Sequence, residues 1–298
     1  MPASSRAVIL CLDLGASSSK WALFADGQMT ASGVDAPLSG HLYTPEARER
    51  MADGLARMCA AVPTPPLSVV VGVAGFQAES SPLIEAMLSS TFHLPQTALY
   101  VTDDLHLAYA AHFSRDGPVG GGTLVYAGTG SMAYHRTAAD EVIRAGGHGF
   151  LIDDAGGAFW QGRQGLKAVL RGVDEGRSES LLASSIFGVI GSQHWLDIRA
   201  YVYGEGREAL ARLAPAVYAA AVDGDPRAQD IQRRAGEELA RLGGAVLRRT
   251  GNSQLALCGG SFNPLVKAAF HAQFVDRDVI LTPTVSPLLG ALALAPVG

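Results

Sequence analysis

Two short hairpins of the same kind, about 115 residues apart, constrain the fold more than any other feature of this 298-residue sequence. In each, an apolar strand runs into a turn of glycine and hydroxyl residues, and a second apolar strand follows directly. The first turn reads Gly15-Ala16-Ser17-Ser18-Ser19-Lys20 after a strand at 8–12, and the second reads Gly128-Thr129-Gly130-Ser131 after a strand at 124–127. The recurrence favours a ligand-binding role for both turns.

Both turns have the composition of a phosphate-binding loop. Glycine lets the backbone approach an anion closely, while hydroxyl and N–H groups point at it. Asp13, at the end of the first strand, is placed to hold a hydrated Mg²⁺. Taken alone, the first turn is equally compatible with an ordinary Gly/Ser turn, so this prediction depends on the recurrence.

The second turn also matches the dinucleotide pattern G-x-G-x-x-G/A over residues 128–133. That device needs a helix directly after the turn, so that the helix N-terminus reaches the pyrophosphate. Here the chain continues as a strand to Arg136, turns, and returns as a strand at 142–145. The pattern therefore disfavours a nicotinamide cofactor. The sequence also has no P-loop motif.

Length and composition define the class of protein. A chain of 298 residues, 48% of them apolar, can form a full core, and we expect two domains. The net charge of −5 gives no reason to expect nucleic acid or an acidic membrane surface as a partner. Cys11, Cys59 and Cys258 are widely spaced, as is typical of a reducing compartment. With no secretory leader and no apolar run that spans a bilayer, we expect a cytoplasmic protein.

The remaining pattern alternates short strands and helices at first and becomes mostly helical from 154 to 251. Strands are predicted at 68–74 and 98–102, and a loop at 32–43. Helices are predicted at 44–61, from Ser81, from Leu105, and at 158–171, 179–190 and 227–248. The last elements are a strand at 255–258, a helix at 263–274, a strand at 279–282 and a helix at 287–295.

Two further positions have the chemistry of a ligand site. Asp103 and Asp104 end a strand and open a helix. Aspartate is a good helix cap, but ligands bind at the carboxyl ends of strands in open α/β sheets, so the second acid is a candidate general base. Gly259-Gly260-Ser261 lies between a strand and a helix start. That turn suits part of a nucleotide, and it equally suits a tight structural connection.

Four segments resemble, in chain order, the phosphate-1, connecting, phosphate-2 and adenosine segments of the actin/hexokinase/Hsp70 ATPase superfamily. These segments are 13–20, 103–104, 128–131 and 259–261. The stretch from Gly146-Gly147-His148-Gly149 to Asp154-Ala155-Gly156-Gly157 resembles the N-acetylglucosamine kinase branch of the BadF/BadG/BcrA/BcrD family. The resemblance implies an α/β fold of two RNase-H-like domains around a nucleotide cleft, with helical additions in the second. It implies domains at 1–114 and 115–285, a helical insertion at about 158–250, and a C-terminal helix at 286–298 that packs back on the first domain.

Carried over residue by residue, the resemblance implies an ATP- and Mg²⁺-dependent kinase that phosphorylates an amino sugar at O6. Asp104 falls on the catalytic aspartate and also contacts the sugar, and Asp103 falls on its variable neighbour; Asp13 remains the metal residue expected from its place at the strand end. The other implied sugar contacts are Gly147, His148, Gly149 and Asp154. The implied ATP contacts are Gly15, Ala16, Ser17, Ser18, Ser19, Lys20, Gly128, Thr129, Gly130, Ser131, Gly259, Gly260 and Ser261.

Four departures from the family pattern leave the exact sugar open. His148 replaces a Trp, Met132 an Asn and Ala155 a Glu, and the loop 37–43 has no clear counterpart of a sugar-binding Asn. N-acetylglucosamine, glucosamine and N-acetylmuramic acid all remain as substrates. An ATPase activator or a sugar-sensing regulatory protein of the same family is the alternative function. The activators bind an iron–sulfur cluster through cysteines, and the phosphate-2 segment here has none. The family suggests a homodimer, with neither nucleic acid nor membrane as a partner.

Overall fold

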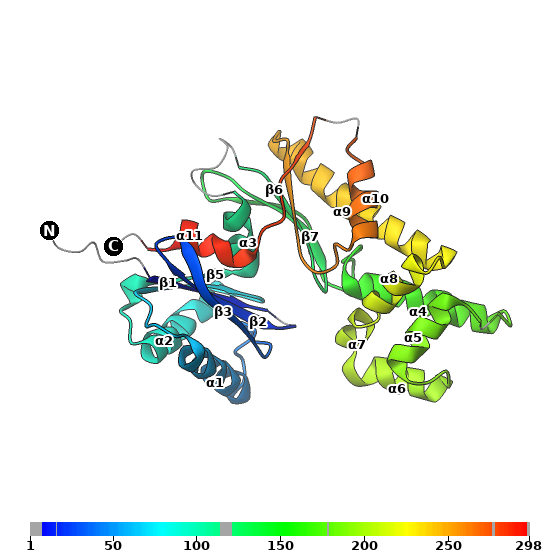
Figure 1. Cartoon of the computed structure of the whole chain (residues 1–298), viewed down its shortest axis with the longest axis horizontal. Helices are drawn as coiled ribbons and strands as arrows, with labels where there is room; N and C mark the ends of the chain where they lie inside the picture. Colours follow the sequence, from blue (N-terminus) through cyan, green and yellow to red (C-terminus); the bar gives the residue numbers. More distant parts are fainter. Residues whose placement is uncertain (1–7, 16, 114–120, 178, 276–277, 297–298) are drawn as a thin grey trace. The chain divides into compact units, whose positions relative to one another are not determined.

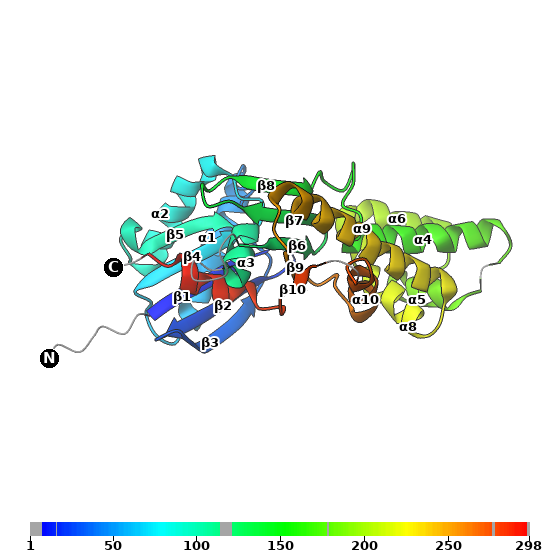
Figure 2. The ribbon, with the colours of Figure 1, turned by 90° about the horizontal axis from the view of Figure 1, so that it is seen from above.

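The computed structural model describes residues 8–15, 17–113, 121–177, 179–275 and 278–296. The chain divides into two compact units, which we describe separately (Figures 1 and 2). Unit 1 comprises Met1–Val119 and Val285–Gly298, and unit 2 comprises Gly120–Thr284. Each unit contains one five-stranded sheet.

In unit 1 the sheet order is β3-β2-β1-β4-β5. The strands are β1 (Val8–Leu14), β2 (Ser19–Ala25), β3 (Gln28–Asp35), β4 (Ser68–Val73) and β5 (Leu99–Asp103). The first three are antiparallel neighbours, while β4 and β5 run parallel to β1. The helices are α1 (Pro45–Ala61), η1 (Ala78–Ser80), α2 (Ser81–Phe92), η2 (Gln96–Ala98), α3 (Asp104–His112), η3 (Pro287–Gly290) and α11 (Ala291–Leu294).

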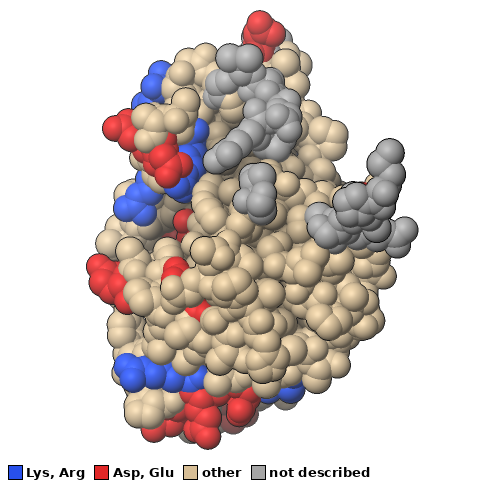
Figure 3. Space-filling model, turned by 90° about the vertical axis from the view of Figure 1, so that its left-hand side faces the viewer, with Lys and Arg blue, Asp and Glu red and all other residues tan. Residues whose placement is uncertain are grey.

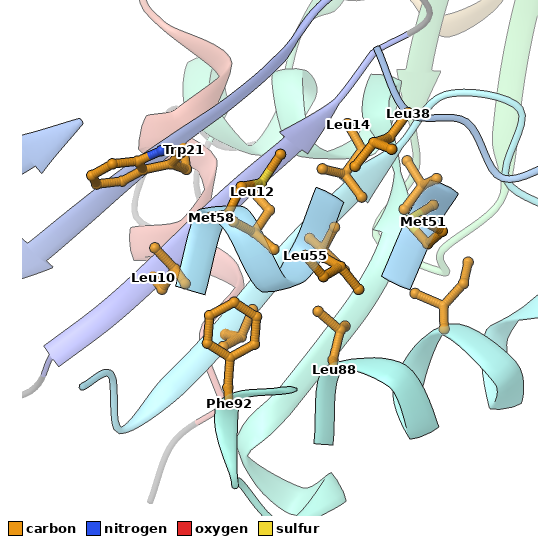
Figure 4. Packing of buried hydrophobic residues seen from close by; sticks show 14 of the residues in the cluster. Leu10, Leu12, Leu14, Trp21, Leu38, Met51, Leu55, Met58, Leu88 and Phe92 are labelled. Atoms are coloured by element: carbon orange, nitrogen blue, oxygen red, sulfur yellow. The ribbon is translucent and has the colours of Figure 1, made fainter. Parts of the chain in front are cut away.

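Alternate side chains of β1 enter two different apolar layers. Leu10, Leu12 and Leu14 pack with α1 and α2 on one face, through side chains that include Leu55 and Leu88 (Figure 4). On the other face, Cys11 packs with residues of α3, η3 and α11. The sheet is therefore covered on both sides, and Asp13 lies on the α3 side because it alternates with Leu12 and Leu14.

The predicted loop at 32–43 is wrong at its start, because residues 28–35 form the edge strand β3. Its side chains are mostly exposed, so the apolar alternation of a half-buried strand is weak here. Gly33 also makes room for the Trp21 ring, since a Cβ at this position would lie 2.5 Å from the indole nitrogen. An edge strand of this composition gives little signal in a sequence.

In unit 2 the sheet order is β10-β9-β6-β7-β8. The strands are β6 (Thr123–Ala127), β7 (Ser131–Arg136), β8 (Val142–Gly146), β9 (Gln254–Cys258) and β10 (Ile280–Leu281). The helices are α4 (Ala158–Asp174), α5 (Leu181–Ile190), α6 (Trp195–Glu205), α7 (Arg207–Ala211), α8 (Ala214–Val222), α9 (Pro226–Thr250) and α10 (Pro264–Ala272). The helix α9 joins two apolar clusters: Leu239 and Val246 pack on the sheet, and Ile231 packs among α4, α5 and α8.

The two sheets have the same topology. In each unit the strands appear in the sheet in the order third, second, first, fourth, fifth, with an antiparallel hairpin formed by the first two. Both predicted hairpins are confirmed, and the predicted two-domain α/β fold with helical additions in the second domain is confirmed with them.

The surface carries few charges for its area. On the face shown in Figure 3, most atoms belong to uncharged residues, and Lys and Arg lie in small groups close to Asp and Glu. This agrees with a charged fraction of 17%. Among the described residues, none of the helices combines the length and the apolar character that crossing a bilayer requires.

Candidate functional site

In unit 1, three carboxylates gather at the carboxyl ends of the parallel strands. Asp13 on β1 lies in register with Gly72 on β4, and Gly72 lies in register with Thr102 on β5. Asp103 ends β5 and Asp104 begins α3. A Cβ at residue 72 would lie 3.2 Å from the Asp104 Cα, so the glycine lets the helix approach the sheet. This brings Asp104 close enough to Asp13 for their charges to interact.

The two neighbouring acids have different roles in the fold. The Asp103 carboxylate accepts a hydrogen bond of 2.8 Å from the His106 backbone N–H and caps α3. The His106 ring is itself held at 2.9 Å from the Thr102 hydroxyl. Asp103 therefore has a structural role as the helix cap, and Asp104 remains the candidate general base.

The environment of Asp104 suits a general base. Its pKa is raised to about 7, chiefly by burial and further by the negative charges of Asp13 and Asp103, while hydrogen bonds from the first N–H groups of α3 oppose the rise. Burial also raises the pKa of Asp13, and Lys20, directly across the β1–β2 hairpin, counteracts the rise. A carboxyl group with a pKa near the working pH can both take and release a proton.

The first predicted phosphate turn is built around Gly15. A Cβ there would lie 2.7 Å from the Ser18 carbonyl oxygen, so only glycine fits. Ser17 is exposed and Ser18 half-buried. Ser19 differs, because its side chain is fully buried on the α1 face of the sheet, opposite Asp13, and its hydroxyl has no partner in the described part of the chain. Ala16 lies outside the described residues.

In unit 2, the second turn and the 259–261 turn are bonded to each other. The Ser261 hydroxyl donates to the Gly128 carbonyl oxygen at 2.7 Å, and the Ser261 N–H donates to the Ala127 oxygen at 2.9 Å. Gly259 has φ of +110°, and a Cβ there would overlap the Ala127 backbone. The structure therefore brings together two segments that the sequence separates by about 130 residues.

The start of α4 fixes the second turn from another side. The N–H groups of Ala158 and Phe159 donate to the carbonyl oxygens of Gly128 (2.9 Å) and Thr129 (3.1 Å). The Ser131 hydroxyl donates to the Ala155 oxygen at 2.7 Å. The turn is thus held through two carbonyl groups, which an anionic ligand does not need, and through the Ser131 hydroxyl, which is already used as a donor to Ala155.

The predicted sugar-contacting stretch adjoins this turn. The Gly147 N–H donates to the Ser131 oxygen at 3.0 Å, while His148 and Gly149 are exposed. Three residues of this stretch have a positive φ, between +61° and +90°: Gly147, Gly149 and Asp154. Aspartate is one of the few residues besides glycine that adopt positive φ readily, so it suits this tight turn.

Asp154 is paired with a residue that sequence reasoning missed. Its carboxylate is 4% exposed, lies against Gly130 and accepts a hydrogen bond of 3.3 Å from Arg207 Nη2. The Arg207 guanidinium stacks on Phe150, 5.4 Å from the ring centre. Burial raises the pKa of Asp154, and the charge of Arg207 opposes the rise. No motif surrounds Arg207, so sequence reasoning had no signal for it.

Sequence reasoning also missed a chain of hydrogen-bonded side-chain amides, which connects two turns of this region. The Asn263 side-chain amide donates to Gln232 Oε1 at 2.5 Å, Gln232 donates to Gln161 Oε1 at 3.1 Å, and Gln161 donates to the Gly156 oxygen at 2.9 Å. Gln161 and Gln232 are at most 1% exposed. The chain links the 259–263 turn to the 154–157 turn across α4 and α9.

The predicted site residues thus form one group in each unit. Unit 1 holds Asp13, Gly15, Lys20 and Asp104 at one end of its sheet. Unit 2 holds the turns 128–131 and 259–261 together with the 147–154 stretch. Sequence reasoning found these segments, while Arg207 and the amide chain became visible only in the structure.

Comparison with known proteins gives three findings. The model of the BadF/BadG/BcrA/BcrD ATPase family matches residues 10–295. The N-acetylmuramic acid/N-acetylglucosamine kinase of Clostridium acetobutylicum is 27% identical over 175 residues, which cover 58% of this chain and 55% of that protein. The chain therefore matches about half the length of this curated relative.

Solved structures show the same fold. A proposed N-acetylglucosamine kinase from Chromobacterium violaceum superposes with a TM-score of 0.77 at 23% identity, over 98% of this chain and 99% of that one. A ROK family glucokinase from Streptomyces griseus, in complex with glucose and AMPPNP, gives a TM-score of 0.62 at 14% identity, over 97% and 99%.

Proposed function

The chain belongs to the BadF/BadG/BcrA/BcrD ATPase family, and from this premise we propose that it is an ATP-dependent kinase of an amino sugar. One observation carries the proposal: Asp104 lies beside Asp13 at the carboxyl ends of parallel strands, with a pKa of about 7. The name of the Clostridium acetobutylicum relative supports an N-acetylated amino sugar as the substrate.

Asp104 acts as the general base. It accepts the proton of the primary hydroxyl of the sugar while that oxygen, O6, attacks the γ-phosphorus of ATP in line. The bond from O6 to phosphorus forms, the bond from phosphorus to the β-phosphate oxygen breaks, and ADP leaves. Such a base contributes roughly 10²- to 10⁴-fold to the rate, and positioning and charge stabilisation supply the rest.

The residues of unit 1 fit a Mg²⁺ ion bound with the nucleotide. In the described part of the chain, no group of three or more His, Cys, Asp or Glu side chains could hold a metal. Mg²⁺ bound with ATP needs only one or two carboxylates, because phosphates and water supply its other ligands. Asp13, half-buried opposite Lys20, is suited to hold the ion through water. When bound, Mg²⁺ neutralises charge on the phosphates.

ATP and the sugar are assigned to the remaining site residues. The backbone N–H groups and hydroxyls of Ser17 and Thr129, with their neighbours in the two turns, bind phosphates. The 259–261 turn receives the adenosine part. Gly147, His148, Gly149 and Asp154 contact the sugar, and Asp154 is buried and charged, as a partner for sugar hydroxyls should be. We also propose a homodimer, as the family resemblance suggests, and a cytoplasmic location, as the sequence predicts.

A coupled assay of ADP release tests the function. The purified protein is supplied with ATP, Mg²⁺ and, one at a time, N-acetylglucosamine, glucosamine and N-acetylmuramic acid. We expect ADP release that depends on one or more of these sugars, with one sugar 6-phosphate formed per ADP, identified by ³¹P NMR. ADP release that no sugar accelerates would contradict the kinase proposal and favour the ATPase activator. Sugar binding without turnover would favour a sensor.

A further inference from the structure

Arg207 is a cation in the functional region of unit 2 to which neither the family resemblance nor the mechanism above gives a role. We propose that Arg207 is a further substrate-binding residue, which binds an anionic oxygen group of a bound substrate beside Gly130. That group is the terminal phosphoryl group of ATP or the carboxylate of an acidic amino sugar such as N-acetylmuramic acid. The inference rests on the kinase function proposed above.

The position of Arg207 is the first argument. Its Nη2 lies 3.3 Å from Asp154 Oδ2, and 2.9 Å from the place where a Cβ on Gly130 would lie. Gly130 belongs to the proposed phosphate turn and Asp154 to the proposed sugar contacts. One guanidinium therefore adjoins both groups of substrate-binding residues within unit 2.

Unused hydrogen-bonding capacity is the second argument. A guanidinium has five N–H donors, and Arg207 uses one of them within the described residues, toward Asp154. Its Nε is buried there without a partner. Buried donors are nearly always satisfied in folded proteins, so an orphan next to a binding turn indicates a partner that arrives with a ligand. The side chain is 35% exposed, which leaves it accessible to one.

The chemistry of the missing partner follows from the shape and charge of the group. The ring of Phe150, 5.4 Å from Cζ, fixes the plane of the guanidinium. A planar fork of donors matches a carboxylate or a phosphoryl group through two parallel hydrogen bonds. The single bond of 3.3 Å to Asp154 is long for a charge-assisted pair, so it leaves the cation able to bind a second anion.

A nearby arginine provides a matched control. Arg212 lies five residues further along the chain, pairs with Glu205 and stacks on Tyr201 at 5.5 Å. Its side chain is 46% exposed. Arg212 therefore has the same chemistry as Arg207, but the partners that it has in the described part of the chain, Glu205 and Tyr201, lie outside the proposed site.

The experiment compares steady-state kinetics of the wild type, Arg207→Gln, Arg207→Lys and Arg212→Gln with N-acetylglucosamine and with N-acetylmuramic acid. Loss of a charge-assisted contact should lower kcat/KM about 10- to 100-fold in Arg207→Gln, and Arg212→Gln should match the wild type. Arg207→Lys, which keeps the charge but not the fork, should recover only part of the loss. Circular dichroism and melting temperature establish that each variant is folded.

The two candidate anions, the phosphoryl group of ATP and the carboxylate of the sugar, predict different kinetic changes in Arg207→Gln. If Arg207 binds the phosphoryl group, kcat falls with both sugars; if it binds the sugar carboxylate, kcat/KM falls for N-acetylmuramic acid alone. Unchanged kinetics with both sugars would overturn the proposal. It would also be overturned if Arg207→Gln had no further effect in an Asp154→Asn background, because Arg207 would then act only through Asp154. Failure of the kinase function itself would appear separately, as a wild type that phosphorylates neither sugar.

Discussion

Replacing Asp104 by Asn should abolish activity and, above neutral pH, stabilise the protein. The amide keeps the shape of the side chain but cannot accept the proton, so kcat should fall at least 10²-fold while the Kd for ATP changes little. The gain in stability has a separate cause. A buried carboxylate beside two other acids is unfavourable in its charged form, and the amide has no charge to bury.

The pKa sets the size and the sign of the stability change. Asp104 titrates at about 7 in the fold, against an ordinary value of 3.8, so the folded chain binds its proton more tightly than the unfolded chain does. The wild type therefore loses stability as the pH rises between these two values. Three pH units at about 1.4 kcal/mol each give an upper limit of about 4 kcal/mol. Because Asp104 keeps some exposure to water, which screens its charge, we expect about 1–2 kcal/mol, or about 2–3 °C in melting temperature for a chain of 298 residues.

The assay is a series of melting curves of ligand-free wild type and Asp104→Asn at pH 5, 6, 7 and 8. The difference in melting temperature, variant minus wild type, should grow from pH 5 and level off above about pH 7. Asp103→Asn is the matched control, because asparagine also caps helices and leaves the base in place. A difference that stayed constant or shrank with rising pH would refute the electrostatic reasoning, and full activity of Asp104→Asn would refute the assignment of the base.

The remaining predictions concern the same machinery. In the wild type, log kcat/KM should rise with pH to an inflection near 7, where Asp104 loses its proton; a flat profile from pH 5 to 8 would contradict this. Gly130→Ala should reduce kcat/KM at least 10-fold, because its Cβ would overlap the Asp154 carboxylate. Gly188→Ala, in open space on a helix, should instead raise stability by about 0.5–1 kcal/mol in urea unfolding. Gln232→Leu should cost about 2–4 kcal/mol in the same assay, because it leaves the buried Gln161 amide and the half-buried Asn263 amide without their partner, and a loss below about 1 kcal/mol would contradict that role.

Local chemistry explains which parts of the structure the sequence could predict. The hairpins were predictable because glycine and hydroxyl runs interrupt apolar strands, and each break appears in the structure at the expected place. The strand β3 was not predictable, because an edge strand with exposed side chains lacks apolar alternation. The helices α6, α7 and α8 were covered only by the general prediction of helix from 154 to 251.

Contacts between distant segments explain what the sequence could not predict. Arg207 lies 53 residues from Asp154 along the chain, and only the packing of α7 makes them neighbours. The amides of Gln161 and Gln232, 71 residues apart, lie on helices whose apolar spacing predicts burial but says nothing of a polar partner. Pair interactions of this kind depend on tertiary structure, which a motif search along one sequence does not contain.

The two units share one sheet topology, but the charge near the repeated hairpin turn differs between them. In unit 1, the end of the sheet carries Asp13, Asp103 and Asp104 against one lysine, Lys20, so it repels the phosphates of a nucleotide unless a divalent cation comes with them. In unit 2, the corresponding hairpin turn has no acid of its own, and Arg207 offsets the buried Asp154 beside it. Under the proposed function, the acids that would make unit 1 a site for proton removal would also make it dependent on Mg²⁺, whereas the unit 2 turn could bind an anion through its own donors. Unequal charge at the two repeated turns would thus let one sheet topology supply the base and the Mg²⁺-dependent phosphate contact in unit 1, and a phosphate contact without a metal in unit 2.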